Sequence, residues 1–170
     1  MNRTISNINQ AITNIMGNDI SLFGICQPVV VVEQDGESKY PALVSIDGEA
    51  QYVFMDDSFL FGGYHKLINK SFSKVAGQGR KDVDIAIYEL AFVFWGFRDK
   101  LSLDELSLES KILPAFPASI DLLQTSYDKQ SIFNSEFKGF EYLLTPDEIL
   151  MSIRYKVQER YVRSCLEINV

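Results

Sequence analysis

The chain of 170 residues is poor in the residue types that most often perform catalysis or bind metals. It has one histidine, His65, and two cysteines, Cys26 and Cys165, with no CxxC pair. Nucleophilic triads and most zinc sites need a histidine beside a nucleophile or further ligands, and two cysteines are too few for a disulfide framework. We therefore expect a surface or interfacial histidine, two partly buried thiols in a reducing compartment, and neither cofactor nor metal.

Long hydrophobic runs and an excess of basic residues are also missing. The longest apolar stretches, Ile25–Val32 and Ala91–Trp95, fall far short of the roughly 20 residues that span a bilayer. The polar start MNRTISNINQ lacks the apolar region of a signal peptide. The formal net charge is −7, whereas nucleic-acid-binding domains are usually basic. We expect a soluble protein made in the cytosol, without membrane contact and without general affinity for nucleic acid.

What the chain does have is enough apolar material for a core. Hydrophobic residues make up 46% of it and charged residues 23%, with 12 Phe, 8 Tyr and one Trp. A chain of this length can bury roughly 70% of its unfolded surface. No linker or repeat interrupts it. We therefore expect a single domain over residues 1–170.

The segment Asp84–Phe97 carries the strongest structural signal. Its sequence DIAIYELAFVFWGF places apolar residues at both odd and even positions. A strand that is apolar on both faces must be covered on both faces. The pattern predicts a strand in the middle of a packed sheet.

The remaining elements follow from shorter patterns. Isoleucines at helical spacing predict a helix over 6–16 that ends at Gly17-Asn18. A β meander follows, with strands over 29–33, 40–46 and 50–55 and turns at Asp35-Gly36 and Asp47-Gly48. Pro41 indicates an edge strand. Residues 62–75 fit a helix or a strand, and the strand is favoured, joined by loop 76–82 to the strand at 84–97.

The C-terminal half predicts one more helix and one more strand. Ser102 followed by Glu105 resembles a capping box for a helix over 103–113, and 119–133 remain unassigned. Residues 150–168 alternate apolar and polar, which is typical of a strand with one face in water. The predicted class is α+β, a mostly antiparallel β-sheet with an N-terminal helix and a second helix packed on it.

Possible chemical sites each have a structural explanation. Asp56-Asp57 falls in a predicted turn, and the pairs at 104–105 and 147–148 follow Ser102 and Pro146, where acids complement a helix N-terminus. The glycine-rich stretch at 77–81 lacks the helix that a phosphate-binding loop requires. An enzyme with a carboxylate site at Asp56 and Asp57 is our third hypothesis.

Two sets of residues are candidates for contacts with partners. Lys66, Lys70, Lys74, Arg80 and Lys81 would make one face of the 62–97 hairpin basic, facing solvent, an acidic neighbouring subunit or DNA. A solvated face is favoured. The aromatic residues of the motif FLFGGY, Phe59, Phe61 and Tyr64, lie close to turn residues, where burial is difficult, and indicate a protein–protein contact.

The order of elements resembles the tail-completion or tail-terminator proteins at the neck–tail junction of tailed phages and prophages. The resemblance is carried by the segments TISNINQAITNIMG, YVFMDDSFLFGGYHKL, IYELAFVFWGFRDKLSLDEL and ILMSIRYKVQERYVRSC. It implies a small α+β domain with an N-terminal amphipathic helix, a meandering antiparallel sheet, a flanking helix and a closing strand. It also implies a ring-forming structural subunit of the virion without catalysis.

Three hypotheses follow, in order of preference. The first is a virion assembly protein, made in the bacterial cytoplasm, that binds itself in a homo-oligomeric ring and also binds other tail or neck proteins. Its possible contact residues are Phe59, Phe61, Tyr64, Arg80 and Lys81. The second is a small protein-binding accessory domain of a bacterial, prophage-borne protein. The third is the enzyme described above.

Overall fold

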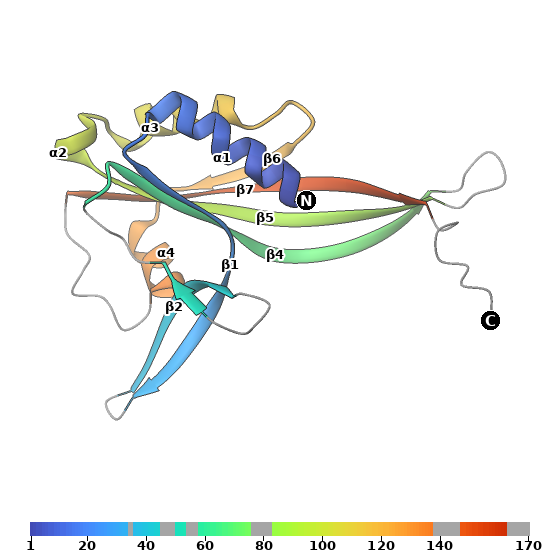
Figure 1. The fold of residues 1–170 in the computed structure, drawn as a ribbon, viewed down its shortest axis with the longest axis horizontal. Coiled ribbons are helices and arrows are strands. Elements are labelled where there is room, and N and C mark those ends of the chain that lie inside the picture. The colour runs from blue at the N-terminus through green and yellow to red at the C-terminus, as the bar shows by residue number, and fades with distance from the viewer. Residues whose placement is uncertain (34–35, 45–49, 54–57, 76–82, 138–146, 163–170) are drawn as a thin grey trace.

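The described residues of a computed structural model, 1–33, 36–44, 50–53, 58–75, 83–137 and 147–162, form a seven-stranded sheet with helices on both faces (Figure 1). The strand order is β3-β2-β1-β4-β5-β7-β6. Neighbouring strands are antiparallel except β1 and β4, which are parallel. The predicted class, an α+β protein with a mostly antiparallel sheet, is confirmed.

Along the described chain, α1 is followed by five strands, and further helices come only after β5. The strands are β1 Ile20–Glu33, β2 Gly36–Val44, β3 Ala50–Tyr52, β4 Phe61–Val75, β5 Val83–Phe97, β6 Asp121–Ser126 and β7 Glu148–Val162. The helices are α1 Asn2–Met16, α2 Arg98–Leu101, α3 Glu105–Ile112, the 3-10 turn η1 Leu113–Ala115, and α4 Lys129–Glu136.

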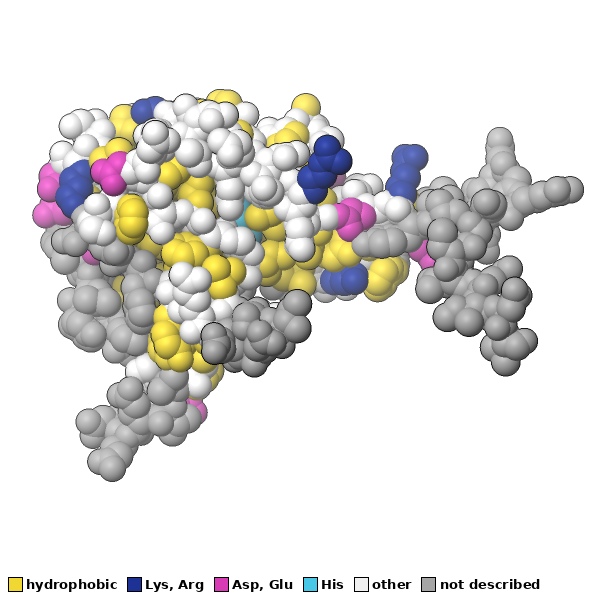
Figure 2. Space-filling model, viewed as in Figure 1, with side chains coloured by type: hydrophobic (Ala, Val, Ile, Leu, Met, Phe, Trp, Pro, Cys, Tyr) yellow, Lys and Arg dark blue, Asp and Glu magenta, His cyan; other side chains and the backbone are white. Residues whose placement is uncertain are grey.

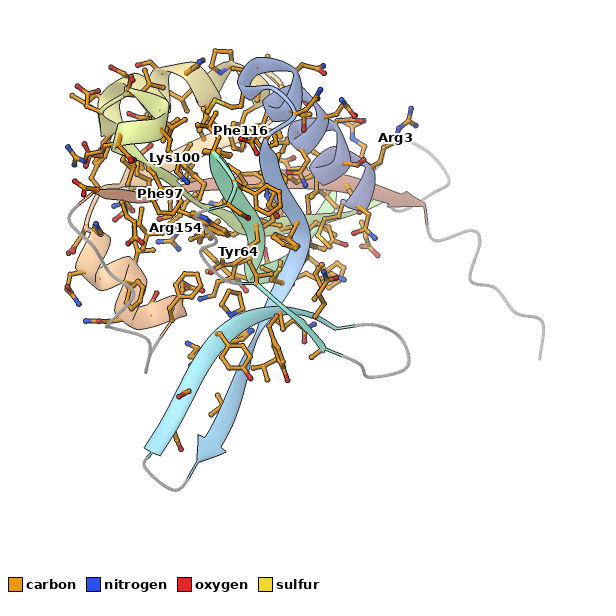
Figure 3. All side chains as sticks on the ribbon, turned by 60° about the vertical axis from the view of Figure 1, so that its left-hand side comes forward. Arg3, Tyr64, Phe97, Lys100, Phe116 and Arg154 are labelled. Carbon is orange, nitrogen blue, oxygen red and sulfur yellow. The ribbon has the colours of Figure 1, made fainter. Side chains whose placement is uncertain are left out.

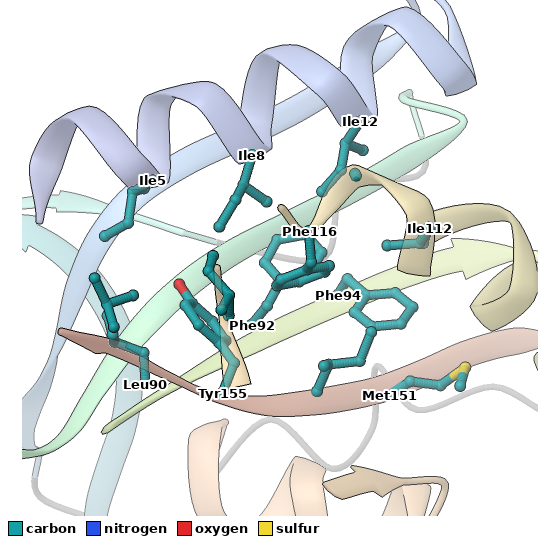
Figure 4. Packing of buried hydrophobic residues seen from close by; sticks show 14 of the residues in the cluster. Ile5, Ile8, Ile12, Leu90, Phe92, Phe94, Ile112, Phe116, Met151 and Tyr155 are labelled. Atoms are coloured by element: carbon teal, nitrogen blue, oxygen red, sulfur yellow. The ribbon is translucent and has the colours of Figure 1, made fainter. Parts of the chain in front are cut away.

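One face of the sheet, called the α1 face, is covered by α1, α3 and η1. Ile5, Ile8 and Ile12 of α1 are buried against this face (Figure 4). Burying such a side chain contributes about 1.5–3 kcal/mol, so this row fixes the helix on the sheet. The predicted N-terminal helix is confirmed, and it begins at Asn2, four residues before the predicted start.

The opposite face, called the α4 face, has a smaller core. Trp95 and Val93 of β5 are buried there with Phe133 and Phe137, from and directly after α4. The central strand β5 is therefore covered on both faces near its end, as its apolar pattern predicts. It lies between β4 and β7, and all of its residues from Val83 to Phe97 are paired with β7.

Two β projections extend beyond the helix-covered centre (Figure 1). The first, called the arm, is the two-stranded hairpin of residues 27–33 in β1 and 36–42 in β2. The second, called the ribbon, comprises the outer parts of three strands, residues 67–75 of β4, 83–90 of β5 and 155–162 of β7. Its inner part still belongs to the core of the α1 face, where five of its residues are buried: Ala86, Tyr88, Leu90, Tyr155 and Val157. The predicted strand over 62–75 and its hairpin pairing with the next strand are thus confirmed.

Several local predictions are wrong for identifiable reasons. Asp104, not Ser102, caps α3, because its carboxylate accepts a hydrogen bond from the Ser107 amide; Ser102 ends α2 in a left-handed conformation with φ of 52°. Strand β2 is not an edge strand, since it pairs with both β1 and β3. Its Pro41 is tolerated because its carbonyl accepts from the Val53 amide on the side away from β1, so the missing N–H of Pro41 also points away from the ladder with β1.

Other elements were missed or misplaced. Strand β1 begins at Ile20, far before the predicted start, and the unassigned segment 119–133 contains β6 and the beginning of α4. The acids at 147–148 do not begin a helix: Glu148 is the buried first residue of β7. The Asp47-Gly48 turn, loop 76–82, Asp56-Asp57, Cys165 and the predicted strand residues 163–168 lie outside the described residues.

Candidate assembly surface and buried polar clusters

His65 is fully buried in β4, so the expectation of a surface or interfacial histidine is wrong. Asn9 of α1 donates from Nδ2 to the carbonyl of Phe23 at 3.0 Å, which leaves its Oδ1 to accept from Nε2–H of His65 at 2.9 Å. The other ring nitrogen, Nδ1, then accepts from the hydroxyl of Tyr155 at 2.7 Å. Every hydrogen-bonding group of the neutral imidazole is used.

The environment of this chain of hydrogen bonds favours neutral groups. Burial lowers the pKa of His65 to about 3, and burial raises the pKa of the Tyr155 hydroxyl well above its usual value of 10. The imidazole stacks on Phe92 with 4.7 Å between ring centroids. A buried, neutral and fully bonded histidine has no free nitrogen for a substrate or a metal, so its role is to join α1 to β4 and β7.

A second buried polar cluster joins α4 to β4. Glu136 accepts from the Tyr64 hydroxyl at 2.8 Å, from Nζ of Lys66 at 2.5 Å and from Oγ of Ser135 at 2.8 Å. Burial, and then the Glu136 carboxylate, raise the pKa of Tyr64 well above 10. The carboxylate is compensated by one cation and two hydroxyls, as a buried charge requires.

Cys26 lies in the core on the α4 face and is 2% exposed. Burial raises the pKa of its thiol to about 12. A thiol is a nucleophile only as the thiolate, so this cysteine is unreactive near neutral pH. The expectation was a partly buried thiol, and Cys26 is a free thiol that is more deeply buried than expected.

A groove of about 370 Å³ opens beside the Glu136 cluster, between α4 and the sheet. Tyr64 and Arg154 lie on this side of the sheet, whereas Phe116 lies on the other (Figure 3). Arg154 pairs with Glu89 at 2.5 Å. Its Nε is buried without a hydrogen-bond acceptor among the described residues. The groove walls are mixed: Lys66, Leu67, Ile68, Ala91, Val93, Ile132, Ser135, Glu136, Ser152 and Arg154.

The five predicted contact residues do not form one surface. Phe61 and Tyr64 are fully buried in the chain's own core, which removes them from any contact between proteins. Phe59 is partly exposed in the segment before β4. Arg80 and Lys81 lie outside the described residues. The aromatic motif was misjudged because alternate residues of β4 face α1 and α4, and both faces are covered at this point.

The predicted basic face of the hairpin is divided between the two sides of the sheet. The pairing of β4 with β5 shifts by one residue at Ile68, between Leu67 and Asn69. This β-bulge reverses the alternation of side chains beyond it. Lys66 therefore bonds Glu136 on the α4 side, while Lys70 lies over the rings of Phe72 and Tyr88 at 5.0 and 5.1 Å.

Exposed apolar side chains lie on the projections and on β6, and also at Tyr52 of β3, at Leu106 of α3 and at Tyr127. Phe72 of the ribbon is 67% exposed and Val30 of the arm is 53% exposed. Leu67, Ile68, Leu122 and Leu123 are also exposed. Figure 2 shows hydrophobic side chains along the projecting ribbon, with lysine and arginine beside them. These residues were missed because nothing in a strand pattern tells which part of the strand the helices cover.

No protein family model matches the chain, and neither does any curated protein sequence. Within the described ranges, no three His, Cys, Asp or Glu side chains group so that they can hold a metal ion. The described helices are too short or too polar to cross a membrane. The function must therefore be inferred from the chain's own surfaces.

Proposed function

We propose that this chain is a non-enzymatic structural subunit of phage tail assembly that forms a ring as a tail terminator or tail-completion protein. The observation that supports the proposal is the presence of two β projections, the arm and the ribbon, which extend from the helix-covered centre. Val30 is exposed on the arm and Phe72 on the ribbon. Hairpins with only two strands are marginally stable in isolation. The arm is such a hairpin, whereas the ribbon has three strands, so it is the arm that would gain a partner when copies assemble.

The polar side chains inside the protein support the same proposal. The chain Asn9–His65–Tyr155 and the cluster around Glu136 have internal partners for their buried groups. Both connect elements that are far apart in the sequence, so their role is to stabilise the fold. Of the elements that the tail-terminator resemblance implies, the fold has an N-terminal amphipathic helix, a flanking helix and a final strand. Its sheet is mostly antiparallel but is not a meander throughout, because β1 pairs with β4 in parallel.

Ring formation is proposed because the arm and the ribbon are different surfaces. When one surface of a subunit binds a different surface of the next, contacts repeat head to tail and close into a ring if the rotation permits. Other tail or neck proteins would bind the faces of that ring, and the assembled protein would reside in the virion.

The test is the solution mass of the full chain by light scattering over a concentration series, followed by electron microscopy. We expect particles that are multiples of the 19.3 kDa subunit and images of closed rings. Co-expression with head and tail proteins encoded by neighbouring genes should yield complexes that contain the ring. A chain that stays monomeric at the highest concentrations and in all such co-expressions contradicts the proposal.

One observation favours a second function, a small protein-binding accessory domain. Strand β6 is at the edge of the sheet and exposes Leu122 and Leu123. An open edge can accept an extended segment of another protein as an additional strand. This function predicts a monomer that binds one partner, and that Leu122→Lys abolishes binding of that partner without changing the monomer.

A further inference from the structure

We infer that two copies of the chain pair through the outer edges of their β4 strands, antiparallel and centred on Ser71, so that one sheet runs through both copies. This inference goes beyond the proposed ring, because it adds a contact in which the same surface of two copies meets across a two-fold axis. The surface is the β4 edge of the ribbon, residues 67–75, and its partner is the same edge of a second copy.

The β4 edge of the ribbon is the longest open strand edge among the described residues. Strand β1 pairs with β4 only as far as Lys66, which lies opposite Cys26. Beyond this point β4 continues to Val75 and is paired with β5 on its other side alone. Figure 1 shows that the arm turns away from the ribbon where β1 and β4 part. Along these nine residues, the outward backbone N–H and C=O groups can bind another strand.

The side chains along this edge alternate between the two faces of the sheet. Lys70 and Phe72 lie on the α1 face, since the β5 residues opposite them are buried in its core. Asn69, Ser71 and Ser73 therefore lie on the α4 face. All five side chains are exposed. Of the large hydrophobic residues described, Phe72 is the most exposed, at 67%.

The lysines of this edge select one register for the pair. Residues directly opposite each other in antiparallel strands share a face, so the two-fold axis passes beside one residue. With the axis at Ser71, Lys70 of each copy stands opposite Phe72 of the other copy. An axis at Lys70 would bring the two Lys70 residues together, and an axis at Phe72 would place Lys70 opposite Lys74. Like charges directly opposite each other destabilise a strand pair, which leaves the register centred on Ser71.

The side chains in this register are compatible on both faces. Lysines commonly protect an open edge from pairing, but the Lys70 ammonium lies over the rings of its own Phe72 and Tyr88, at 5.0 and 5.1 Å, and so is held above the α1 face. In the pair, the exposed phenyl ring of each copy joins the Lys70 cluster of the other. On the α4 face Asn69 stands opposite Ser73, so no charge is buried there.

The other open edge of the ribbon fits a second copy less well. Strand β6 pairs with β7 only between Ser152 and Lys156, which leaves residues 157–162 without a described strand beside them. Glu159 and Arg160 occupy the middle of this edge. A two-fold pair centred there would place one of these charged residues opposite itself. The charges therefore favour the β4 edge over the β7 edge.

Cysteine cross-linking tests the pair and its register. All variants carry Cys165→Ser, and the remaining Cys26 is buried. Ser71→Cys places two thiols opposite each other at the axis, so mild oxidation should give a covalent dimer. Ser73→Cys is the matched control on the same face: its two thiols are offset by four residues, about 13 Å, which is too far for a disulfide. Ser71→Cys should form the dimer at least about tenfold faster, because pairing raises the effective thiol concentration.

A mixture of Asn69→Cys and Ser73→Cys chains tests the antiparallel direction. These two positions are opposite each other in the proposed pair, so the mixture should link one chain of each kind, whereas neither variant should link to itself. Parallel strands would place each residue beside its own copy. Ser73→Cys chains that link to themselves as fast as Ser71→Cys chains would therefore overturn the inference.

Charge variants measure how much the central contact contributes. Phe72→Lys brings a second cation opposite Lys70 and should raise the dissociation constant of the pair at least about tenfold. Adding Lys70→Glu to that variant places opposite charges across the axis and should restore pairing. Leu106→Lys is the matched control, because Leu106 is similarly exposed, at 64%, but lies on α3. Equal effects of Phe72→Lys and Leu106→Lys, in chains folded by circular dichroism, would overturn the inference.

The remaining outcomes separate the inference from the proposed function. Closed rings in which Ser71→Cys links no faster than Ser73→Cys overturn the inference and leave the ring intact. Covalent Ser71→Cys dimers without larger particles support the inference and contradict the ring. An unchanged chain that stays monomeric, without such cross-links, overturns both. If Cys165 is retained, a disulfide between it and Ser71→Cys of the same chain assigns the edge to the chain's own last residues and overturns the inference.

Discussion

The hydroxyl of Tyr155 donates a hydrogen bond to Nδ1 of His65 over 2.7 Å, although the two residues are 90 positions apart in the sequence. The bond crosses from β7 to β4, and Asn9 extends it to α1 through the other ring nitrogen. Three elements of the fold are therefore held in register by one side chain that has no exposed surface.

Removing the Tyr155 hydroxyl should destabilise the fold without changing its shape. In Tyr155→Phe, Nδ1 of His65 loses its donor and stays buried, which costs about 1–3 kcal/mol. Chemical denaturation should show this loss as a lower midpoint with an unchanged slope. Tyr127→Phe is the control, because the Tyr127 hydroxyl bonds Glu109 at an exposed site; a loss of equal size there would contradict the prediction.

The free energy of unfolding should fall as the pH is lowered below about 6.5. The folded chain keeps His65 neutral, with a pKa of about 3, while the unfolded chain binds a proton near pH 6.5. Over the pH range between these two values the unfolded state holds one more proton at this residue, so stability declines by about 1.4 kcal/mol per pH unit as pH falls.

His65→Gln isolates this contribution, since glutamine keeps a donor and an acceptor but does not titrate. The variant should be less stable at pH 7 and should lose less stability between pH 6.5 and 5 than the unchanged chain. Denaturant titrations at several pH values measure both slopes. Equal slopes would show that His65 is not the residue responsible.

Glu136 should be required for the attachment of α4. In Glu136→Ala, the hydroxyl of Tyr64 stays fully buried and loses its acceptor, and Lys66 loses its ion pair. We expect a loss of about 1–3 kcal/mol and faster hydrogen exchange in residues 129–136. Glu105→Ala, which removes the more exposed ion pair with Arg98, should cost at most about 1 kcal/mol. Similar losses in both variants would contradict the prediction.

Gly62 should not tolerate a side chain. A Cβ at this position would lie 2.4 Å from the Trp95 ring, whereas at Gly24 the nearest atom is a flexible Leu43 methyl at 4.0 Å. Gly62→Ala forces the buried indole to move, which typically costs about 1–3 kcal/mol. Gly24→Ala should be close to neutral. Thermal unfolding of the two variants, followed by tryptophan fluorescence, compares them, and equal melting temperatures would be inconsistent with this packing.

The sequence predicted the elements whose signals are local and strong. The isoleucine spacing located α1, and the two-faced apolar run at 84–97 located the central strand, because both patterns follow from burial alone. Strand β1 was largely missed because its first half, ISLFGIC, is short and interrupted by glycine. Its partner in the sheet, β4, begins 41 residues later, at Phe61, so nothing local signals the pairing.

The site was harder to predict than the fold. Whether His65 is buried depends on Asn9 and Tyr155, which are far away in the sequence. The predicted basic residues of the hairpin lie on two sides of the sheet because of a single bulged residue, Ile68. No residue propensity predicts a bulge at this position. Helix α4, with the sequence KQSIFNSE, has only a weak apolar stripe. Which apolar residues of the ribbon are exposed depends on how far the helices extend over the sheet, and no local sequence pattern predicts that extent.

The position of β7 inside the sheet has a consequence for synthesis of the protein. It is the last described strand along the chain, yet it lies between β5 and β6. Until residue 162 has left the ribosome, β5 has an open edge along its whole length. During synthesis the most apolar strand is therefore paired on one side only, so chaperones that bind exposed apolar segments should increase the fraction of the chain that folds.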